Sequence, residues 1–186
     1  MYIENNGVKI DGVFIPPFTL DEGEIVVLSI PNDERFFKTE MLLRDVFIGN
    51  IPIQGIKINT KFTFVEHWSE SKLKQLLKPC TVGKYLKRNA NVNDAFALRI
   101  YENDWIKETT KVHLLAGTKK RQLCLFATLS KTNNIIIDLL GTDPKGSFET
   151  LKIVQKAVKK KGSAILIDCF ENINCNFVKY VKVQTY

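Results

Sequence analysis

The sequence contains no long apolar run. None of its hydrophobic stretches approaches the roughly 18 to 20 consecutive residues that a membrane-spanning helix needs. The first ten residues, MYIENNGVKI, have neither the basic start nor the apolar stretch of a signal peptide. These absences argue against an integral membrane protein and against a secreted one, so we expect a soluble, cytoplasmic protein.

Side chains that bind metals or form disulfides are also few. The four cysteines form no C-x-x-C pair, and only two histidines could join them as metal ligands. Neither histidine lies in a recognisable catalytic or metal-binding pattern. We therefore expect reduced, mostly buried thiols and histidines on the surface or at helix ends. The residues concerned are Cys80, Cys124, Cys169, Cys175, His67 and His113.

The charge is on the basic side, with 27 Lys and Arg against 20 Asp and Glu and a net charge of +7. The lysines are spread along most of the chain, which favours a solvated face over a nucleic-acid site. The alternative is a basic nucleic-acid-binding module that uses Lys119, Lys120, Arg121 and the lysines near 156–161. With 186 residues and 45% hydrophobic composition, the chain can bury a core as one domain, 1–186.

Three near-continuous apolar runs predict strands that are buried on both faces. They are Gly23 to Ile30, Ile135 to Asp138 and Ala164 to Asp168. Apolar residues at helical spacing follow in Lys38 to Phe47 and in Ser147 to Lys161. Buried strands that alternate with amphipathic helices indicate an α/β fold with a parallel sheet at its core.

The first third of the chain also contains short strand candidates between turn residues, which suggest an antiparallel β layer beside the core. These candidates are Val8 to Ile10, Phe14 to Phe18, Gly55 to Ile58 and Thr63 to Val65. A polar and helical stretch then predicts a helical insertion at about 69–130.

Two stretches in the same order resemble the nucleotide-binding domain of ABC transporters. Leu115 to Leu129, LAGTKKRQLCLFATL, is similar to that family's signature loop, L-S-G-G-Q-x-x-R, and the helix behind it. Ile135 to Pro144, IIIDLLGTDP, is similar to the Walker B strand and the D-loop, with Asp138 and Asp143 as their aspartates. The resemblance implies a P-loop NTPase-like, ABC ATPase-like fold: a parallel sheet core, an antiparallel β layer and a helical subdomain.

The signature-like loop is altered relative to the family. Ala116 stands where the resemblance implies a phosphate-binding serine, and Thr118-Lys119 stands where it implies Gly-Gln. Gly117 and the helix start behind it could still meet an anion, helped by lysines. The signature-like residues are Leu115, Ala116, Gly117, Thr118 and Lys119, followed by Lys120.

The phosphate loop of the resembled family has no clear counterpart. Where G-x-x-x-x-G-K-S/T is expected, the sequence contains IPNDERFFKTEM, which has no glycine. Glycines let successive backbone amides converge on a phosphate. Asp33 and Glu34 instead place carboxylates where a polyphosphate would lie.

Three residues of this segment remain candidates for nucleotide binding: Asn32, Lys38 and Thr39. Aligning Lys38-Thr39 with the family's Lys-Ser/Thr pair requires extra residues before it, whereas an alignment without gaps puts Phe36 at the lysine position. The simpler interpretation is that Lys38 and Thr39 begin an ordinary helix, with Asp33 as its N-cap.

The hydrolytic positions are altered as well. Leu139 takes the place of the glutamate that polarises the attacking water, and Phe170 takes the place of the switch histidine. The metal-contacting glutamine is absent, with Glu66 or His67 nearest to its place. Asp138 is either a metal ligand or a carboxylate that only satisfies backbone donors at a strand end.

These departures predict an ABC transporter ATP-binding-protein-like subunit that has lost ATP hydrolysis, a pseudo-ATPase with a structural or regulatory role. Its expected partners are another ABC ATPase subunit, in a homodimer or heterodimer, and a membrane permease at the inner face of the membrane. The alternative is a divergent but functional ABC transporter ATPase, and only then would ATP and Mg²⁺ be cofactors. Nucleic acid is the less favoured partner.

Overall fold

The computed structural model describes residues 1–159, 161–169 and 178–186. Two compact units are present in it. The first unit comprises Met1–Phe64, Asn134–Leu140 and Ile153–Tyr186, and the second comprises Val65–Asn133 and Gly141–Lys152. The strands of the described chain all belong to the first unit, whereas the second unit is helical.

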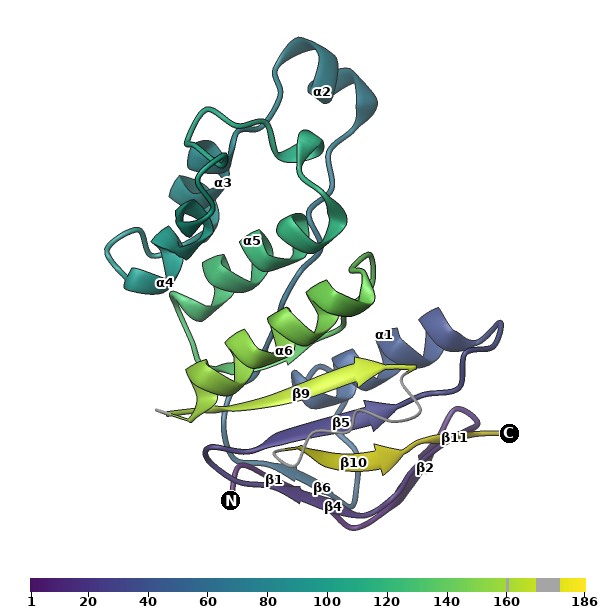
Figure 1. The fold of residues 1–186 in the computed structure, drawn as a ribbon. Helices are drawn as coiled ribbons and strands as arrows, with labels where there is room; N and C mark the ends of the chain where they lie inside the picture. The colour runs from purple at the N-terminus through teal and green to yellow at the C-terminus, as the bar shows by residue number, and fades with distance from the viewer. Residues whose placement is uncertain (160, 170–177) are drawn as a thin grey trace. The chain divides into compact units, whose positions relative to one another are not determined.

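A five-stranded parallel sheet is the centre of the first unit, with the strand order β10-β5-β9-β8-β7. Figure 1 shows β10, β5 and β9 of this sheet side by side. Every residue of β5 and β9 is buried, as expected for strands covered on both faces. The α/β class with a parallel core is therefore confirmed. The strands are β5 (Ile25–Ser29), β7 (Thr63–Phe64), β8 (Asn134–Ile137), β9 (Ser163–Asp168) and β10 (Lys179–Lys182).

The strand candidate Thr63 to Val65 was assigned to the wrong layer. We expected it in the antiparallel layer, but Thr63 and Phe64 pair in parallel with Ile135 and Ile136 of β8. A strand of two residues has no periodicity that could identify its sheet, so its neighbours in space decide the pairing.

Two small antiparallel sheets complete the strands of the first unit, in the orders β4-β1-β6 and β11-β3-β2. They confirm the expected antiparallel layer. The predicted strand Phe14 to Phe18 is two strands, because Pro16 and Pro17 lie between them and proline cannot donate to a ladder. The strands are β1 (Ile3–Asn5), β2 (Val8–Ile10), β3 (Val13–Ile15), β4 (Phe18–Leu20), β6 (Ile56–Ile58) and β11 (Gln184–Thr185).

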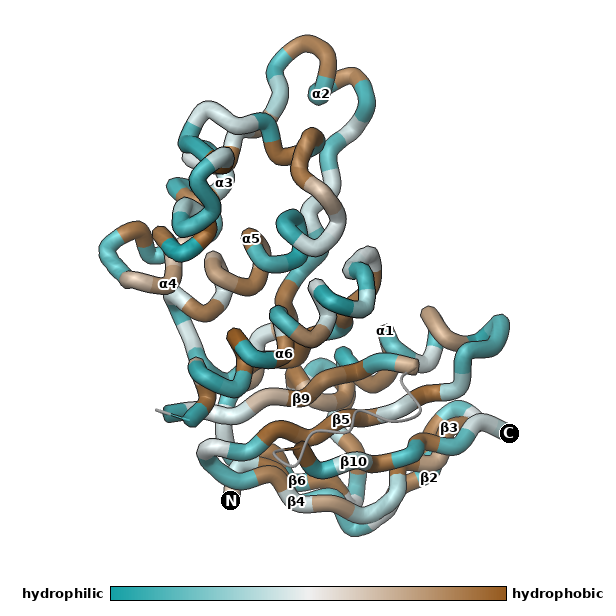
Figure 2. Tube along the Cα trace, in the orientation of Figure 1, coloured by the Kyte–Doolittle hydropathy of each residue, from teal (hydrophilic) through white to brown (hydrophobic). Residues whose placement is uncertain are grey.

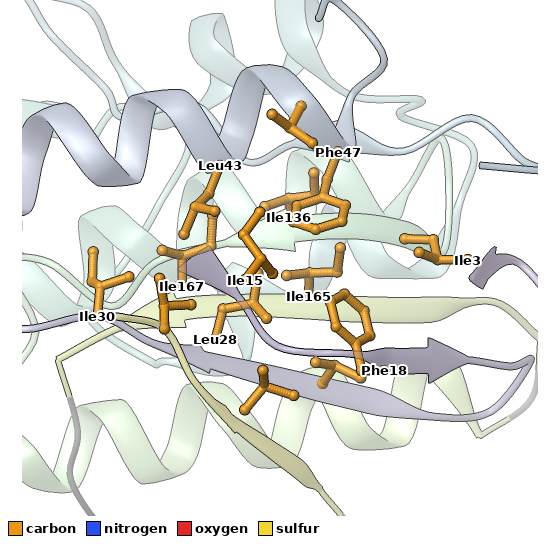
Figure 3. Packing of buried hydrophobic residues seen from close by; sticks show 14 of the residues in the cluster. Ile3, Ile15, Phe18, Leu28, Ile30, Leu43, Phe47, Ile136, Ile165 and Ile167 are labelled. Atoms are coloured by element: carbon orange, nitrogen blue, oxygen red, sulfur yellow. The ribbon is translucent and has the colours of Figure 1, made fainter. Parts of the chain in front are cut away.

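Helix α1 (Phe36–Phe47) joins the core of this unit, as the close view in Figure 3 shows. Leu43 and Phe47 are fully buried and belong to one apolar cluster with residues of the parallel sheet. The Phe47 ring also lies 5.7 Å from the ring of Phe18 in β4. Strands β5 and β9 are accordingly among the most hydrophobic segments in Figure 2.

The second unit contains short helices around the longer helix α5 (Gly117–Leu129), which contacts α3, α4 and η1. Helix α6 (Pro144–Val158) begins in this unit. No helix among the described residues is long and apolar enough to cross a membrane. The shorter elements are α2 (Lys72–Leu77), α3 (Val82–Asn89), α4 (Ala95–Leu98), η1 (Arg99–Glu102) and η2 (Val112–Leu114).

Candidate functional site

The loop between β5 and α1 is folded around the side chain of Asp33. One carboxylate oxygen of Asp33 accepts a hydrogen bond of 2.8 Å from the Arg35 amide, and its carbonyl accepts one of 3.0 Å from the Phe36 amide. The other carboxylate oxygen lies 3.9 Å from the Arg35 guanidinium. A carboxylate of the protein thus binds an amide at the place where a phosphate loop would present its amides to a ligand.

Asp33 is not the N-cap of α1, contrary to our prediction. The helix begins at Phe36, two residues earlier than predicted, so its N-cap is Arg35 and no side chain caps it. Asp33 precedes the cap, and its side chain closes a turn by accepting a hydrogen bond from the amide two residues later. The Thr185 hydroxyl (3.4 Å from Asp33 Oδ2) and the Tyr186 carbonyl, bound by Arg35, tie this turn to β11 and the chain after it.

The three nucleotide-binding candidates, Asn32 in this loop and Lys38 and Thr39 in α1, differ in exposure. Asn32 and Lys38 are exposed to solvent, whereas Thr39 is only 3% exposed. Successive helical residues point about 100° apart. Lys38 and Thr39 therefore face solvent and core respectively, and Phe36 beside them is buried.

Two buried carboxylates lie at the carboxyl ends of the neighbouring strands β8 and β9. Asp138 is fully buried, and its Oδ1 accepts a 2.9 Å hydrogen bond from the Leu140 amide. Asp168 is 5% exposed and accepts hydrogen bonds from the amides of Leu139 at 3.2 Å and Cys169 at 2.7 Å. Burial raises the pKa of Asp168, and the charge of Asp138 adds a smaller effect in the same direction.

Sequence reasoning singled out Asp138 but missed Asp168. The signal was available, because both strands end in the same pattern, III-Asp in β8 and ILI-Asp in β9. An acidic residue that closes a fully apolar strand is a polar group at the sheet edge, where α/β proteins bind ligands. The side chain after Asp138 is Leu139, which is 5% exposed and can accept no proton.

The remaining positions of the hydrolytic pattern are Phe170, Glu66 and His67. Phe170 lies outside the described residues. Glu66 and His67 are both exposed. No group of three or more His, Cys, Asp or Glu side chains that could hold a metal occurs in the part of the chain that the structure describes. The residues around Asp138 do not fit a Mg²⁺ site as they stand, since Asp138 is fully buried and bonded to the backbone.

The cysteines are free thiols where the structure describes them, as expected. Among the three cysteines that the structure describes, Cys124 is buried, but Cys80 and Cys169 are half-buried. The expectation of mostly buried thiols was therefore too strong. Cys175 lies outside the described residues.

The signature-like loop forms a tight junction between the starts of α5 and α6. Ala116 is the N-cap of α5 and provides no capping side chain. The next residue, Gly117, has no room for a side chain, because a Cβ atom there would lie 1.9 Å from the carbonyl oxygen of Gly141. At Gly146 a Cβ would lie 2.1 Å from the Thr118 hydroxyl. The glycines permit close backbone packing, and a carbonyl oxygen lies beside Gly117, where we expected an anion.

Asp143 holds this junction together. The Thr118 hydroxyl donates a 2.7 Å hydrogen bond to Asp143 Oδ2, and the Gly146 amide donates one of 2.9 Å to Asp143 Oδ1. Asp143 thereby caps α6, which begins at Pro144, a residue favoured at the first helical position. These bonds, the one from Gly146 first, lower the pKa of Asp143. The structure thus brings Thr118 of the signature-like loop and the D-loop-like Asp143 into direct contact.

The basic residues after Gly117 are engaged within the protein. Arg121 is 2% exposed and donates to the carbonyls of Val65 at 2.7 Å and Glu66 at 3.3 Å. Lys119 donates to Gln122 at 3.0 Å, and Lys120 lies 5.8 Å from the centre of the Trp68 ring. Arg121 was offered as part of a nucleic-acid surface, and its burial removes it from that surface.

Comparison with known proteins gives a result at the level of structure only. No family model matches the sequence, and no curated protein is detectably similar to it. A structure described as an ABC transporter ATP-binding protein from Pyrococcus furiosus matches with a TM-score of 0.68 and 20% identity, over 96% of this chain and 95% of that one. The chain has the fold of an ABC transporter ATP-binding domain.

Two further structures show how broadly this ABC ATP-binding fold occurs. CbiO1 from Clostridium perfringens, described as part of the ABC transporter complex cbiONQ, matches with a TM-score of 0.63 and 15% identity, over 98% of this chain and 86% of that one. The RNase-L inhibitor matches with a TM-score of 0.59 and 17% identity, over 98% of this chain but only 39% of its own. The expected ABC ATPase-like architecture is therefore confirmed. At these identities the roles of Asn32, Lys38, Thr39, Asp138 and the signature-like residues stay predictions.

Proposed function

We propose that this chain is an ABC-type ATP-binding-like subunit that has lost ATP hydrolysis and acts as a structural or regulatory partner of an active ATPase or of a membrane permease. The observation that carries the proposal is the glycine-free loop between β5 and α1, closed on Asp33. The fold is that of an ABC ATP-binding domain. The loop in the place of the phosphate loop contains no glycine, and its Arg35 amide bonds the Asp33 carboxylate.

Weak nucleotide binding follows from the chemistry of this loop. A phosphate is bound by amides that converge on it at a helix N-terminus. Here the Arg35 amide is bonded to the carboxylate of Asp33, and the Phe36 amide to its carbonyl. A phosphate would have to displace these bonds. It would also meet the negative charge of Asp33, with a repulsion of about 1 kcal/mol at 4 Å in water and more where water is excluded.

Loss of hydrolysis is supported by the residue after Asp138. Phosphoryl transfer to water needs a group that orients and polarises the attacking water. The Leu139 side chain is apolar, and its amide is bonded to Asp168. The resemblance implies a glutamate here, so this position supplies no base.

A partner role is supported by what the chain retains. The junction of Gly117, Thr118 and Asp143 is tightly packed. In the resembled family, signature loops act on the nucleotide of a partner subunit, so a subunit that has lost its own site can still serve an active one. CbiO1, which shares the fold, is described as part of a transporter complex.

Calorimetry of the full chain with MgATP tests the loss of the nucleotide site. We expect no saturable binding up to about 1 mM, the concentration that corresponds to roughly −4 kcal/mol, and no release of phosphate. Micromolar binding with hydrolysis that disappears in Asp138→Asn would contradict the proposal. Asp104→Asn, an exposed acid-to-amide change in the second unit, is the control, and the melting temperature of each variant shows that it is folded.

The partner role is tested separately by co-expression. ABC ATPases and permeases encoded beside this chain in its genome would be expressed with it, one at a time, and purified through a tag on the other protein. We expect a stable complex with at least one of them. If such neighbours are absent, or if they are present and none co-purifies with the chain, the partner role fails.

The divergent ATPase remains the second candidate because of one observation. Asp138 and Asp168 are two buried carboxylates at the carboxyl ends of adjacent strands, where ligands of α/β proteins bind. A rearranged loop that exposed them could hold a cation. The calorimetric experiment with Asp138→Asn separates the two functions.

A further inference from the structure

Helix α2 (Lys72–Leu77) exposes three leucines on one side. Leu73, Leu76 and Leu77 are 67%, 81% and 73% exposed, and no residue of the helix is buried. Their spacing places them within about 100° of one another around the helix axis, on one contiguous face. Scattered exposed leucines are ordinary, but a contiguous apolar face on a surface helix marks an interaction site.

The side of α2 opposite the leucines bonds the residues just before the helix. Gln75, which points away from the leucines, is half-buried and donates a 2.9 Å hydrogen bond to the Glu70 carbonyl. Ser71 caps the helix by accepting from the Lys74 amide, and Pro79 follows two residues after the last helical position. Figure 2 shows hydrophobic positions in the α2 segment, and the side chains of Leu73, Leu76 and Leu77 remain exposed.

Lysines border this leucine face. Lys72 and Lys74 lie about 100° to either side of its centre, and Lys78 follows at the end of the helix. All three are exposed. Lysines at this position can extend their ammonium groups toward anions while their methylene stems cover apolar surface. An apolar face between cationic margins is the arrangement of helices that lie in the headgroup region of an anionic bilayer.

We propose that α2 is a membrane-surface contact: Leu73, Leu76 and Leu77 insert among the headgroups of an anionic membrane, and Lys72, Lys74 and Lys78 pair with the lipid phosphates. A second copy of the chain fits this face less well. A two-fold interface would place identical patches against each other and bring the lysines together. A protein groove fits less well too, because a helix of six residues is only about 9 Å long and offers far less than the area of a stable interface.

Vesicle flotation with the full chain tests this contact. Vesicles of 70% phosphatidylcholine and 30% phosphatidylglycerol are compared with pure phosphatidylcholine at 150 mM salt. We expect binding to the anionic vesicles at least tenfold stronger than to the neutral ones. Leu73→Gln/Leu76→Gln/Leu77→Gln should weaken it at least tenfold. The matched control is Val92→Gln/Leu98→Gln, which changes other exposed apolar residues of the second unit and should leave binding within about twofold.

A second pair of variants separates local charge from net charge. Lys72→Glu/Lys74→Glu/Lys78→Glu and the control Lys145→Glu/Lys156→Glu/Lys159→Glu each replace three exposed lysines, so both lower the net charge equally. We expect at least a tenfold loss for the α2 variant and less than threefold for the control. Equal losses would show attraction by net charge alone and would overturn the proposal.

Three other outcomes would also overturn it: no vesicle binding by the unaltered chain, binding that survives the leucine triple change, or self-association in sedimentation that the leucine change abolishes. The last would show that a second copy covers this face. The contact does not depend on whether ATP is bound or hydrolysed. A negative vesicle experiment would leave the calorimetric result intact, and a negative calorimetric result would leave the membrane contact intact.

Discussion

Two helices of this protein begin beside an aspartate, α1 in the first unit and α6 in the second, and the aspartates act differently. The Asp33 carboxylate bonds the Arg35 amide before α1 begins, and no side chain caps that helix. The Asp143 carboxylate bonds the Gly146 amide within the first turn of α6 and also accepts from Thr118. Asp33 thus closes the loop before α1, whereas Asp143 joins the start of α6 to the start of α5.

The two segments also differ in how closely their backbones pack. The α5/α6 junction needs glycines because backbone packs against backbone there, and Gly117 and Gly146 are present. The loop before α1 contains no glycine and makes no such approach. The α5/α6 junction thus contains the glycines that close backbone packing requires, and the loop before α1 contains none. This contrast can be tested one residue at a time.

Gly117→Ala should produce the largest change in stability. Its Cβ would lie 1.9 Å from the carbonyl oxygen of Gly141, a backbone atom that cannot rotate away. We expect a loss of about 3 kcal/mol in the free energy of unfolding, as for other overpacked sites, or a fall of about 6 to 12 °C in melting temperature for a chain of this size. Denaturant and thermal unfolding would measure it.

Gly83→Ala is the matched control for that change, since Gly83 also lies in the first turn of a helix. Its Cβ would lie 3.0 Å from Glu108 Cβ and 3.2 Å from the Glu108 carbonyl oxygen, which is tight but far less close than the contact at Gly117. Alanine also favours a helix over glycine by about 1 kcal/mol. A net change within about 1 kcal/mol is expected. Equal losses in the two variants would show that the Gly117 junction is not specially tight.

Removal of the cap on α6 should have a smaller effect. Asp143→Ala should lower the melting temperature, but by less than Gly117→Ala, while Asp143→Asn, which can still accept from the Gly146 amide, should retain most of the stability. Thr118→Val should add little once Asp143 has been changed, because the two side chains bond each other. Fully additive losses would mean that they act independently.

Asp143 and Asp168 should give opposite dependences of stability on pH. The folded pKa of Asp143 lies below its ordinary value of 3.8, so its contribution is present above that value and is lost as pH falls through the lowered pKa. The folded pKa of Asp168 is raised, so its contribution is present below 3.8 and is lost as pH rises through the raised pKa.

Unfolding in urea between pH 3 and pH 7 would measure both dependences. Asp143→Asn should reduce the loss of stability on the acid side, and Asp168→Asn should reduce the loss on rising pH. Each variant serves as the control for the other. If both variants changed the same side of the profile, one of the two assigned pKa directions would be wrong.

The long, strongly patterned elements were the part of the fold that sequence could predict. The apolar runs that cover β5 and most of β8 and β9 identified the parallel core, because strands buried on both faces have few polar residues. Strands β1, β10 and β11 were missed, since they are short and partly polar and form only through partners distant in sequence. The same reason explains why β7 was placed in the wrong layer.

The candidate site was predictable where it depends on local sequence. Gly117 marks the start of α5, whereas α6 begins at Pro144, three residues before the predicted start at Ser147, because the Asp143-Pro144 pair is itself a helix-start signal. Contacts between distant segments were not predictable in this way. The bond from the Leu139 amide to Asp168 and the burial of Arg121 against the Val65 carbonyl depend on tertiary packing, which no spacing pattern records.

Asp33→Ala should have the smallest effect on stability, and it tests the loop before α1. The bond from the Arg35 amide is exposed and local, so its loss should cost about 0.5 kcal/mol. If charge alone kept phosphate away, MgATP binding would appear in this variant. We expect none by calorimetry, because the segment still lacks the glycines that let amides converge. Glu34→Ala, which also removes one carboxylate from the loop, is the control. Binding in Asp33→Ala alone would show that Asp33 occupies an otherwise competent phosphate site.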